Sequence, residues 1–240
     1  MDTLPPELSH FTVPDLVGVL LLLGVWIGMT FLIENAPLRW PSTSNLMADY
    51  RREWMVQFVD RDPRIFDSQV IGQLRQGTSF FASATLIAIG GALALLGDLE
   101  RVMGLADDLS AGQRPMIVWE VKILLIVLFL VNAFLKFVWS NRLFGYCAVL
   151  MGAVPNQSDH PAALPRARKA GEINITAARG FNRGLRALYC ALAATAWLLG
   201  AYPLIAAALV TALVLLRREF ASASRAVLMQ PDNAENHTET

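Results

Sequence analysis

The chain has 240 residues, of which 55% are hydrophobic and 17% are charged, and its 20 basic and 20 acidic residues cancel to a formal net charge of zero. A soluble domain carries about 25% charged residues, and the mean hydropathy of this chain is +0.44. These values exclude a disordered chain, a nucleic-acid binder that depends on bulk positive charge, and a secreted domain held by disulfides. They indicate a membrane protein.

The first predicted membrane span covers residues 15–34. It contains the uncharged apolar run Leu16–Ile33, which follows Pro14 and Asp15 at a helix start. About 20 apolar residues are needed to cross the hydrocarbon core, and inside lipid a helix satisfies its own backbone. The segment lacks a basic start and a small-residue cleavage site, so we interpret it as a retained anchor rather than a signal peptide.

The second predicted span covers residues 77–97. Two helical segments are predicted before it, and the later of them leads into the span. Asp62 and Pro63 form a good cap and first turn for a helix that leads into this span. Small residues of the span repeat every four positions, at Ala84, Ala88 and Ala92, which favours close helix packing. The preceding segment is predicted to be an amphipathic cytoplasmic helix, because its apolar residues recur at helical spacing: Leu46, Met47, Tyr50, Trp54, Met55 and Phe58.

The third predicted span covers residues 116–138. A helical stripe of apolar residues continues beyond it until Pro155, which predicts a long helix that protrudes from the membrane. Residues 156–165 are predicted to form a loop.

The last apolar region, residues 185–216, allows two interpretations. Gly200 and Pro203 are a stop and a start signal, which favours two spans at residues 181–199 and 203–217 joined by a tight turn. The alternative is one helix kinked at Pro203. A helix of that length would run about 48 Å, which is too long for one span without strong tilt.

Most basic residues lie between the first and second spans, between the third and fourth, or after the last one. The positive-inside rule then places the N-terminus outside and the C-terminus in the cytoplasm. Five spans are favoured because four would put Arg217, Arg218 and Arg225 outside. We therefore predict an all-α polytopic transmembrane helix bundle over residues 1–228 in a bacterial inner membrane, and a disordered acidic tail at residues 229–240.

Signals of a soluble-type enzyme are missing from the sequence. His10, His160 and His237 are scattered, and no phosphate-binding loop, dinucleotide-binding loop or nucleophile elbow occurs. Cys147 and Cys190 are predicted to be reduced, and two cysteines alone do not make a metal site. We expect no enzyme activity, no metal and no cofactor.

Lys122 is the deepest charge in the predicted spans, about 10 Å from the start of the third one. Burying an ionisable group in a membrane is costly, so Lys122 could belong to an ion or proton path with Glu120 or Asp15 as its partner. Alternatively, Lys122 extends to the outer interface and Glu120 stabilises the first helical turn. Both interpretations stay open at the level of sequence.

Other polar residues in or near the spans also have two interpretations. Ser79 and Ser83 suit either helix packing or a hydroxyl-lined path, and Asn132 and Lys136 suit an interhelical hydrogen bond and an inner-interface contact. The clusters Arg51-Arg52-Glu53-Trp54 and Arg217-Arg218-Glu219-Phe220 suit headgroup contacts with internal ion pairs, or the binding of an anionic lipid or a partner.

Five stretches in order resemble a membrane family catalogued as domain of unknown function 599, found in bacteria and plants. The resemblance covers roughly residues 15–228 and implies an integral, all-helical membrane protein with no activity to carry over. The stretches are Arg51–Met55, Ser79–Ser83 running into Gly90-Gly91, Phe134–Arg142, Phe181–Arg186 and Arg218–Ser222. The family's recurrent polar positions match Arg52, Trp54, Ser79, Ser83, Lys136, Trp139, Arg142, Asn182, Arg186, Arg218 and Glu219 here, which implies a polar network on the inner face.

These observations favour a structural or accessory membrane component, as a homo-oligomer or with a membrane partner protein. A small transporter or channel is the alternative. A third possibility, an enzyme acting on lipids, is supported only by the arginine–glutamate clusters. The expected partners are the lipid bilayer and anionic lipid at the cytoplasmic face, and no nucleic acid. The candidate functional positions are Arg52, Ser79, Ser83, Glu120, Lys122, Asn132, Lys136, Arg142, Asn182, Arg186, Arg218 and Glu219.

Overall fold

All regular structure in the described part of the chain is helical, which confirms the predicted all-α class. The structure is a computed structural model that describes residues 10–99, 104 and 115–231. Its elements are α1 (Val13–Glu34), α2 (Thr43–Asp60), α3 (Ile65–Gly97), α5 (Met116–Gly152), α6 (Ala163–Thr195), the short 3₁₀ helix η2 (Ala196–Leu199), α7 (Ala201–Phe220) and α8 (Ala223–Leu228).

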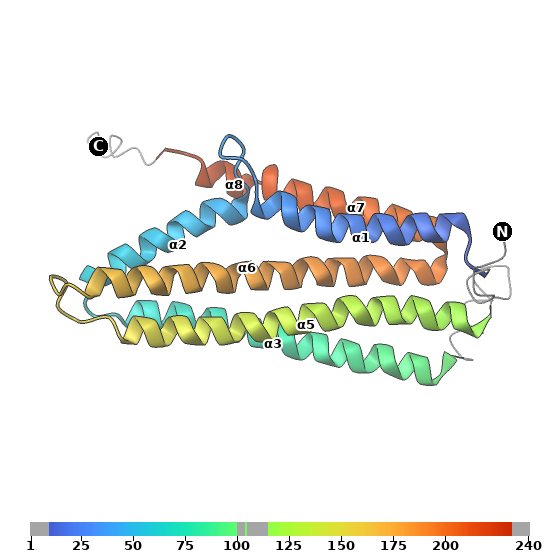
Figure 1. The fold of residues 1–240 in the computed structure, drawn as a ribbon, viewed down its shortest axis with the longest axis horizontal. Helices are drawn as coiled ribbons and strands as arrows, with labels where there is room; N and C mark the ends of the chain where they lie inside the picture. Colours follow the sequence, from blue (N-terminus) through green and yellow to red (C-terminus); the bar gives the residue numbers. More distant parts are fainter. Residues whose placement is uncertain (1–9, 100–103, 105–114, 232–240) are drawn as a thin grey trace, which may run out of the picture.

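The helices form an elongated bundle around α6 (Figure 1). Helix α6 contacts α1, α2, α5 and α7, while α3 packs against α5 and α1 packs against α7. One half of the bundle contains α1, α7 and parts of α3, α5 and α6. The other half contains α2 and the remaining parts of α3, α5 and α6. The long helices therefore connect both halves.

The chain turns sharply from α1 into α2 at Ser42. The Ser42 hydroxyl donates to the Ile33 carbonyl at 2.8 Å and accepts from the Asn45 amide at 3.2 Å, so one buried side chain closes α1 and caps α2. Helix α2 lies where the sequence predicts a cytoplasmic helix.

Helices α3 and α5 are both longer than a single span. Helix α3 runs unbroken from Ile65 into the apolar region, and α5 continues beyond the predicted third span to Gly152, as the sequence predicts. The small residues of α3 are only partly used within the chain, because Ala92 is buried whereas Ala84 and Ala88 are exposed.

Residues 185–216 form two helices rather than one kinked helix. Helix α6 and η2 end at Gly200, and α7 returns alongside α6 in the opposite direction (Figure 1). Gly200 has φ of 131°, a conformation that residues with a Cβ rarely adopt. The kinked-helix alternative is therefore wrong. Helix α6 also starts far earlier than residue 181, at Ala163.

The tightest packing in the bundle is between α5 and α6. Gly184 lies against the buried ring of Phe137, so close that a Cβ at this position would be 2.6 Å from the Phe137 Cε1 atom. The Phe137 ring also packs against Phe81 and Phe181, each with a centroid separation of 5.4 Å. This aromatic cluster joins α3, α5 and α6 near the middle of the bundle.

Three of the described helices, α1, α3 and α5, are long and apolar enough to cross a membrane. Helices α6 and α7 are not among them, so the five-span count stays a prediction. Cys147 and Cys190 are both buried and unbridged. Most of the predicted acidic tail, and most of the segment between the second and third predicted spans, lies outside the described residues.

Candidate functional site: an arginine-lined cleft

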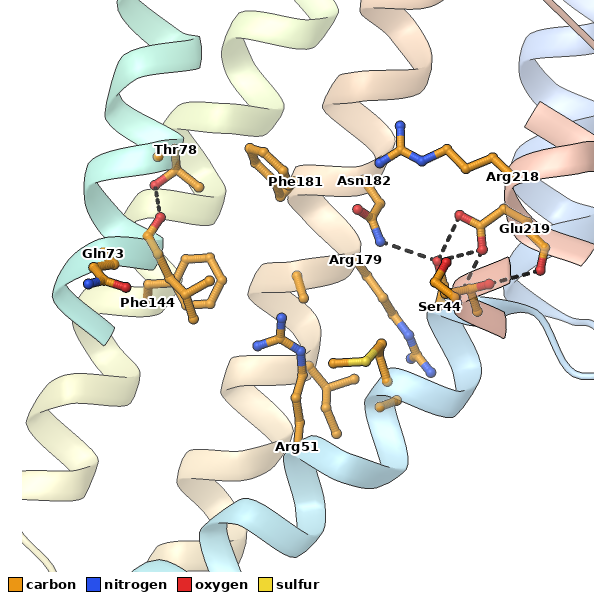
Figure 2. A pocket seen from close by; sticks show the side chains of 18 residues that line it. Ser44, Arg51, Gln73, Thr78, Phe144, Arg179, Phe181, Asn182, Arg218 and Glu219 are labelled. Carbon is orange, nitrogen blue, oxygen red and sulfur yellow. Dashed lines mark hydrogen bonds between the residues drawn. The ribbon is translucent and has the colours of Figure 1, made fainter. Parts of the chain in front are cut away.

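A cleft of about 420 Å³ opens where α2, α3, α6 and α7 come together, and Figure 2 shows it from close by. Its apolar lining includes Leu74, Phe144, Ile175 and Phe181. Its charged lining comes from three arginines and one glutamate, each arginine on a different helix: Arg51, Arg179, Arg218 and Glu219. The cleft thus combines an apolar surface with an excess of positive charge.

Glu219 closes one end of the cleft by binding the start of α2. Its carboxylate accepts from the Ser44 amide at 3.1 Å and from the Ser44 hydroxyl at 3.0 and 3.1 Å. The N-terminus of a helix carries unsatisfied amides and partial positive charge, so a carboxylate is favoured there. Asn182 on α6 donates to the Ser44 hydroxyl at 3.3 Å, which joins α2, α6 and α7 (Figure 2).

The hydrogen bonds shown for two of the three arginines go to neutral groups. Arg51 donates to the Asn174 side-chain oxygen, and Arg218 donates to the Tyr189 hydroxyl at 2.9 Å. Burial lowers the pKa of Arg51, although a guanidinium stays charged at any physiological pH. The positive charge of Arg51 is therefore partly removed from water next to a neutral partner.

Cys147 lies behind the cleft, next to the Asn174 side chain that binds Arg51. Its thiol is fully buried, donates to the Ala170 carbonyl at 3.4 Å and accepts from the Asn174 amide at 3.5 Å. Burial raises the pKa of the Cys147 thiol, while the hydrogen bond from Asn174 and the charge of Arg51 oppose that shift. A neutral buried thiol is structural rather than nucleophilic.

A second polar cluster joins the end of α1 to α6. Arg186 donates to the Glu34 Oε1 atom at 2.6 Å and to the Thr30 hydroxyl at 3.2 Å. Arg183 binds the same carboxylate, with its Nε 2.8 Å from Oε1. The side chain of Arg186 is 4% exposed whereas that of Arg183 is 44% exposed, so one carboxylate holds a buried and an exposed arginine.

Two shallower hollows contain other predicted residues. Asn132 and Lys136 line a groove with Glu34 and Arg183 between α1 and α5. Ser79, Ser83 and Arg142 line a hollow between α3 and α5, where Asn141 donates to the Ser79 hydroxyl. Arg52 lies in none of these hollows. It pairs on the surface with Asp49 and Glu172, and its hydrogen bond to Glu172 raises its pKa.

Lys122 lies at the other end of the bundle, far from the cleft, and is 1% exposed. Its ammonium lies 4.5 Å from the Trp119 ring centroid and 5.9 Å from that of Trp197. The Trp197 indole donates to the buried Asp15 at 2.7 Å, so Asp15 and Lys122 share this tryptophan. The expectation that Lys122 extends to the outer surface is wrong, because Trp119 and Trp197 enclose it. Glu120, two residues before Lys122 and so on the other side of α5, is partly exposed.

The structure brings the predicted positions Asn182, Arg218 and Glu219 together at one cleft and places Arg52, Ser79, Ser83, Lys136, Arg142 and Arg186 elsewhere. Ser44, Arg179 and Glu34 are not among the positions predicted from the sequence, and Arg51 is predicted only as part of the Arg51–Trp54 cluster. One signal was available: Arg179, Arg183 and Arg186 recur at four- and three-residue spacing and so share one face of α6. No three His, Cys, Asp or Glu side chains among the described residues are grouped to hold a metal ion. Among its lining residues the cleft has three arginines and one carboxylate, Glu219.

The chain was also compared with known proteins. The family described as "Protein of unknown function, DUF599" matches residues 17–224. No curated protein matches the chain, and no solved structure does.

Proposed function

The chain belongs to the DUF599 family of proteins of unknown function, and we propose that it is a five-span structural or accessory component of a bacterial inner membrane. The single observation that carries the proposal is a belt of exposed apolar side chains on α1, α3, α5 and α7. Such a surface is unfavourable in water and is what a lipid environment requires.

The belt includes helices beyond the three that are apolar enough to span. On α7, Leu209, Val210 and Leu213 are between 54% and 65% exposed. They resemble Leu20 and Ile27 of α1 in this respect, at 58% and 63%. We infer that α7 also faces lipid and forms the fifth span.

Helix α6 differs from α1 and α7 in its surroundings, because neighbouring helices rather than lipid cover most of it. It contacts α1, α2, α5 and α7, and its buried positions are small or polar, such as Ala187, Ala191 and Arg186. A helix at the centre of a membrane bundle does not need an apolar surface on every side. This supports α6 as the fourth span despite its arginines.

The cytoplasmic half supports an accessory rather than a catalytic role. Most basic residues lie in the half of the bundle that contains α2 or at the ends of α1 and α7 that adjoin it (Figure 1), and the positive-inside rule assigns this side to the cytoplasm. There α2, α3, α5 and α6 form a folded layer with its own apolar core, including Met55, Phe58 and Cys147. A rigid layer of this kind suits the support of a membrane partner.

Cysteine labelling in intact cells tests the topology. In a variant whose two native cysteines are alanine, Tyr202→Cys at the outer turn should react with a membrane-impermeant maleimide. Ser158→Cys in the cytoplasmic loop should react only after the membrane is opened, as both side chains are well exposed. Labelling of Ser158→Cys from outside contradicts the proposed orientation, and protection of Tyr202→Cys contradicts the α6–α7 hairpin.

Lys122 favours a transporter as the second candidate function, since a buried cation in a span is costly. A proton path through Lys122 predicts that Lys122→Met lowers proton flux into proteoliposomes, measured with a pH-sensitive dye. Lys169→Met is the matched control, because Lys169 is an exposed lysine outside the predicted spans. Equal flux in wild type and Lys122→Met contradicts the transporter.

A further inference from the structure

We propose that the cleft between α2, α3, α6 and α7 binds the phosphate of an anionic phospholipid from the cytoplasmic leaflet, with Arg51, Arg179 and Arg218 as its ligands. This inference rests on the five-span topology proposed above. It goes beyond general attraction of basic residues to a membrane surface, because it assigns the lipid to one built site.

The charge of the cleft is the first argument. Three guanidinium groups from three helices surround one hollow, and the one carboxylate that lines it, Glu219, is already bound by Ser44. The bonds shown for Arg51 and Arg218 go to an amide and a phenol, not to an acid. A guanidinium pairs most strongly with a carboxylate or phosphate, through two parallel hydrogen bonds. The cleft therefore has positive charge in excess of its own acids.

The position of the cleft relative to the proposed membrane boundary is the second argument. Thr78 on α3 and Phe181 on α6 line it, and these residues lie at the start of the second and fourth predicted spans, 77–97 and 181–199. Arg218, on α7, lies two residues after the end of its apolar run at Leu216. All three mark the boundary between the proposed spans and the cytoplasm, where phospholipid headgroups lie.

The apolar lining is the third argument, and it favours a lipid over a soluble phosphate. Leu74, Ile175 and Phe181 lie on the same surface as the arginines, on the α3 and α6 sides of the cleft. A site for a small soluble phosphate needs only polar donors. An amphiphile places its phosphate among the arginines and the start of its acyl chains on this apolar surface.

Lipid retention measured by native mass spectrometry tests the site. The purified protein is mixed in detergent with equimolar phosphatidylglycerol and phosphatidylcholine, and we expect selective retention of phosphatidylglycerol. In the double variant Arg179→Gln/Arg218→Gln this preference should fall about tenfold, as two charge-assisted contacts are lost. The matched control is Arg217→Gln, which removes an exposed arginine next to Arg218 that does not line the cleft.

A second variant tests the cleft without removing an arginine. Gln73 on α3 lines the same hollow and is exposed, so Gln73→Glu adds a negative charge there with little effect on folding. It should also reduce phosphatidylglycerol retention, whereas the neutral exchange Gln73→Asn should not.

Three results would overturn the proposal. One is equal retention of the two lipids by the wild type, and another is an equal loss in the Arg217→Gln control. The third is displacement of phosphatidylglycerol by soluble glycerol 1-phosphate at comparable concentration, which would assign the cleft to a soluble ligand. The cysteine-labelling experiment reports the topology separately, so a wrong topology and a cleft without lipid give different results.

Discussion

Ser44 and Glu219 are 175 positions apart in the sequence, yet the Ser44 amide lies 3.1 Å and its hydroxyl 3.0 Å from the same Glu219 carboxylate oxygen. The contact places a negative charge at the N-terminus of α2 and fastens α2 to the end of α7. Charges at helix ends contribute about 0.3–1 kcal/mol, and hydrogen bonds to charged groups about 1.5–3 kcal/mol.

Glu219→Gln should therefore destabilise the protein by about 1–2 kcal/mol, because a neutral amide loses the charge but keeps one acceptor. The expected result is a drop of roughly 2–8 °C in the unfolding midpoint, measured by tryptophan fluorescence in detergent. Glu53→Gln, an exposed change on α2, is the control and should leave the midpoint unchanged. Equal midpoints for Glu219→Gln and wild type would mean that this contact does not hold α2 in place.

The two arginines on Glu34 should differ strongly in their contribution to stability. Removing Arg186 takes away the buried partner of Glu34 and the donor to the Thr30 hydroxyl, and only the exposed Arg183 stays on this carboxylate. Breaking a buried ion pair costs about 3–5 kcal/mol. Removing the exposed Arg183 costs about 0–1 kcal/mol, because solvent screens that pair. The midpoints of Arg186→Gln and Arg183→Gln report this difference directly.

A double variant sharpens this prediction. If the cost of Arg186→Gln comes from the loss of the buried partner of Glu34, then Glu34→Gln/Arg186→Gln should be more stable than the sum of the single changes predicts. Additive losses would instead mean that Arg186 acts through its packing in the bundle.

The contact of Gly184 with Phe137 predicts opposite effects of alanine at two neighbouring glycines. Gly184→Ala places a Cβ 2.6 Å from a buried ring that Phe81 and Phe181 hold on other sides, so about 1–3 kcal/mol of overpacking outweighs the helix-propensity gain of about 1 kcal/mol. Gly180→Ala meets its nearest atom at 3.6 Å and should raise the unfolding midpoint slightly.

Phe137→Leu supplies the internal check on this explanation. A smaller side chain makes room for the new methyl group, so Gly184→Ala should cost less in a Phe137→Leu background than in wild type. An unchanged cost would show that the ring is not what restricts this position.

Cys147 predicts a pH dependence of stability at the alkaline side. Since burial raises the pKa of its thiol, the folded state favours the neutral form and binds its proton more tightly than the unfolded chain does. The stabilisation is fully present below the unfolded pKa of about 8.5 and is lost as the pH rises through the folded pKa.

The difference in midpoint between wild type and Cys147→Ala should thus shrink above about pH 9. Maleimide labelling gives a second measurement. Both proteins carry Cys190→Ala, so each has a single thiol. The buried Cys147 thiol should react far more slowly than the exposed thiol introduced by Ser158→Cys in the protein that also carries Cys147→Ala. Equal labelling rates would contradict the buried, neutral state of Cys147.

The long helices were predictable because their signals are local. Helical periodicity continues through α2, α3 and α5, and the Gly200–Pro203 stop and start signals predicted the turn between α6 and α7. The start of α6 was missed because its first half is not apolar. Its buried side chains are small instead, at Ala163, Ala167 and Ala170, a pattern that hydropathy does not detect.

The cleft was harder to predict because it depends on which face of each helix is buried. Arg51 and Arg52 are neighbours in sequence, yet successive residues on a helix point about 100° apart. Arg51 lines the cleft, whereas Arg52 lies on the surface. Because α2 has apolar residues on more than one side, the sequence does not show which of these two arginines faces the bundle. Contacts such as Ser44 with Glu219 depend on tertiary arrangement alone.

Helices α3, α5 and α6 each run without a break from one half of the bundle to the other, so each moves as a rigid rod. The first 18 residues of α6, 163–180, rise about 27 Å beyond the proposed membrane boundary, so a tilt of about 5° in the bilayer swings the far tip by about 2 Å. No flexible joint lies at the boundary within these three helices. In the proposed topology, the tilt of these helices in the bilayer and the position of the cytoplasmic layer are therefore coupled.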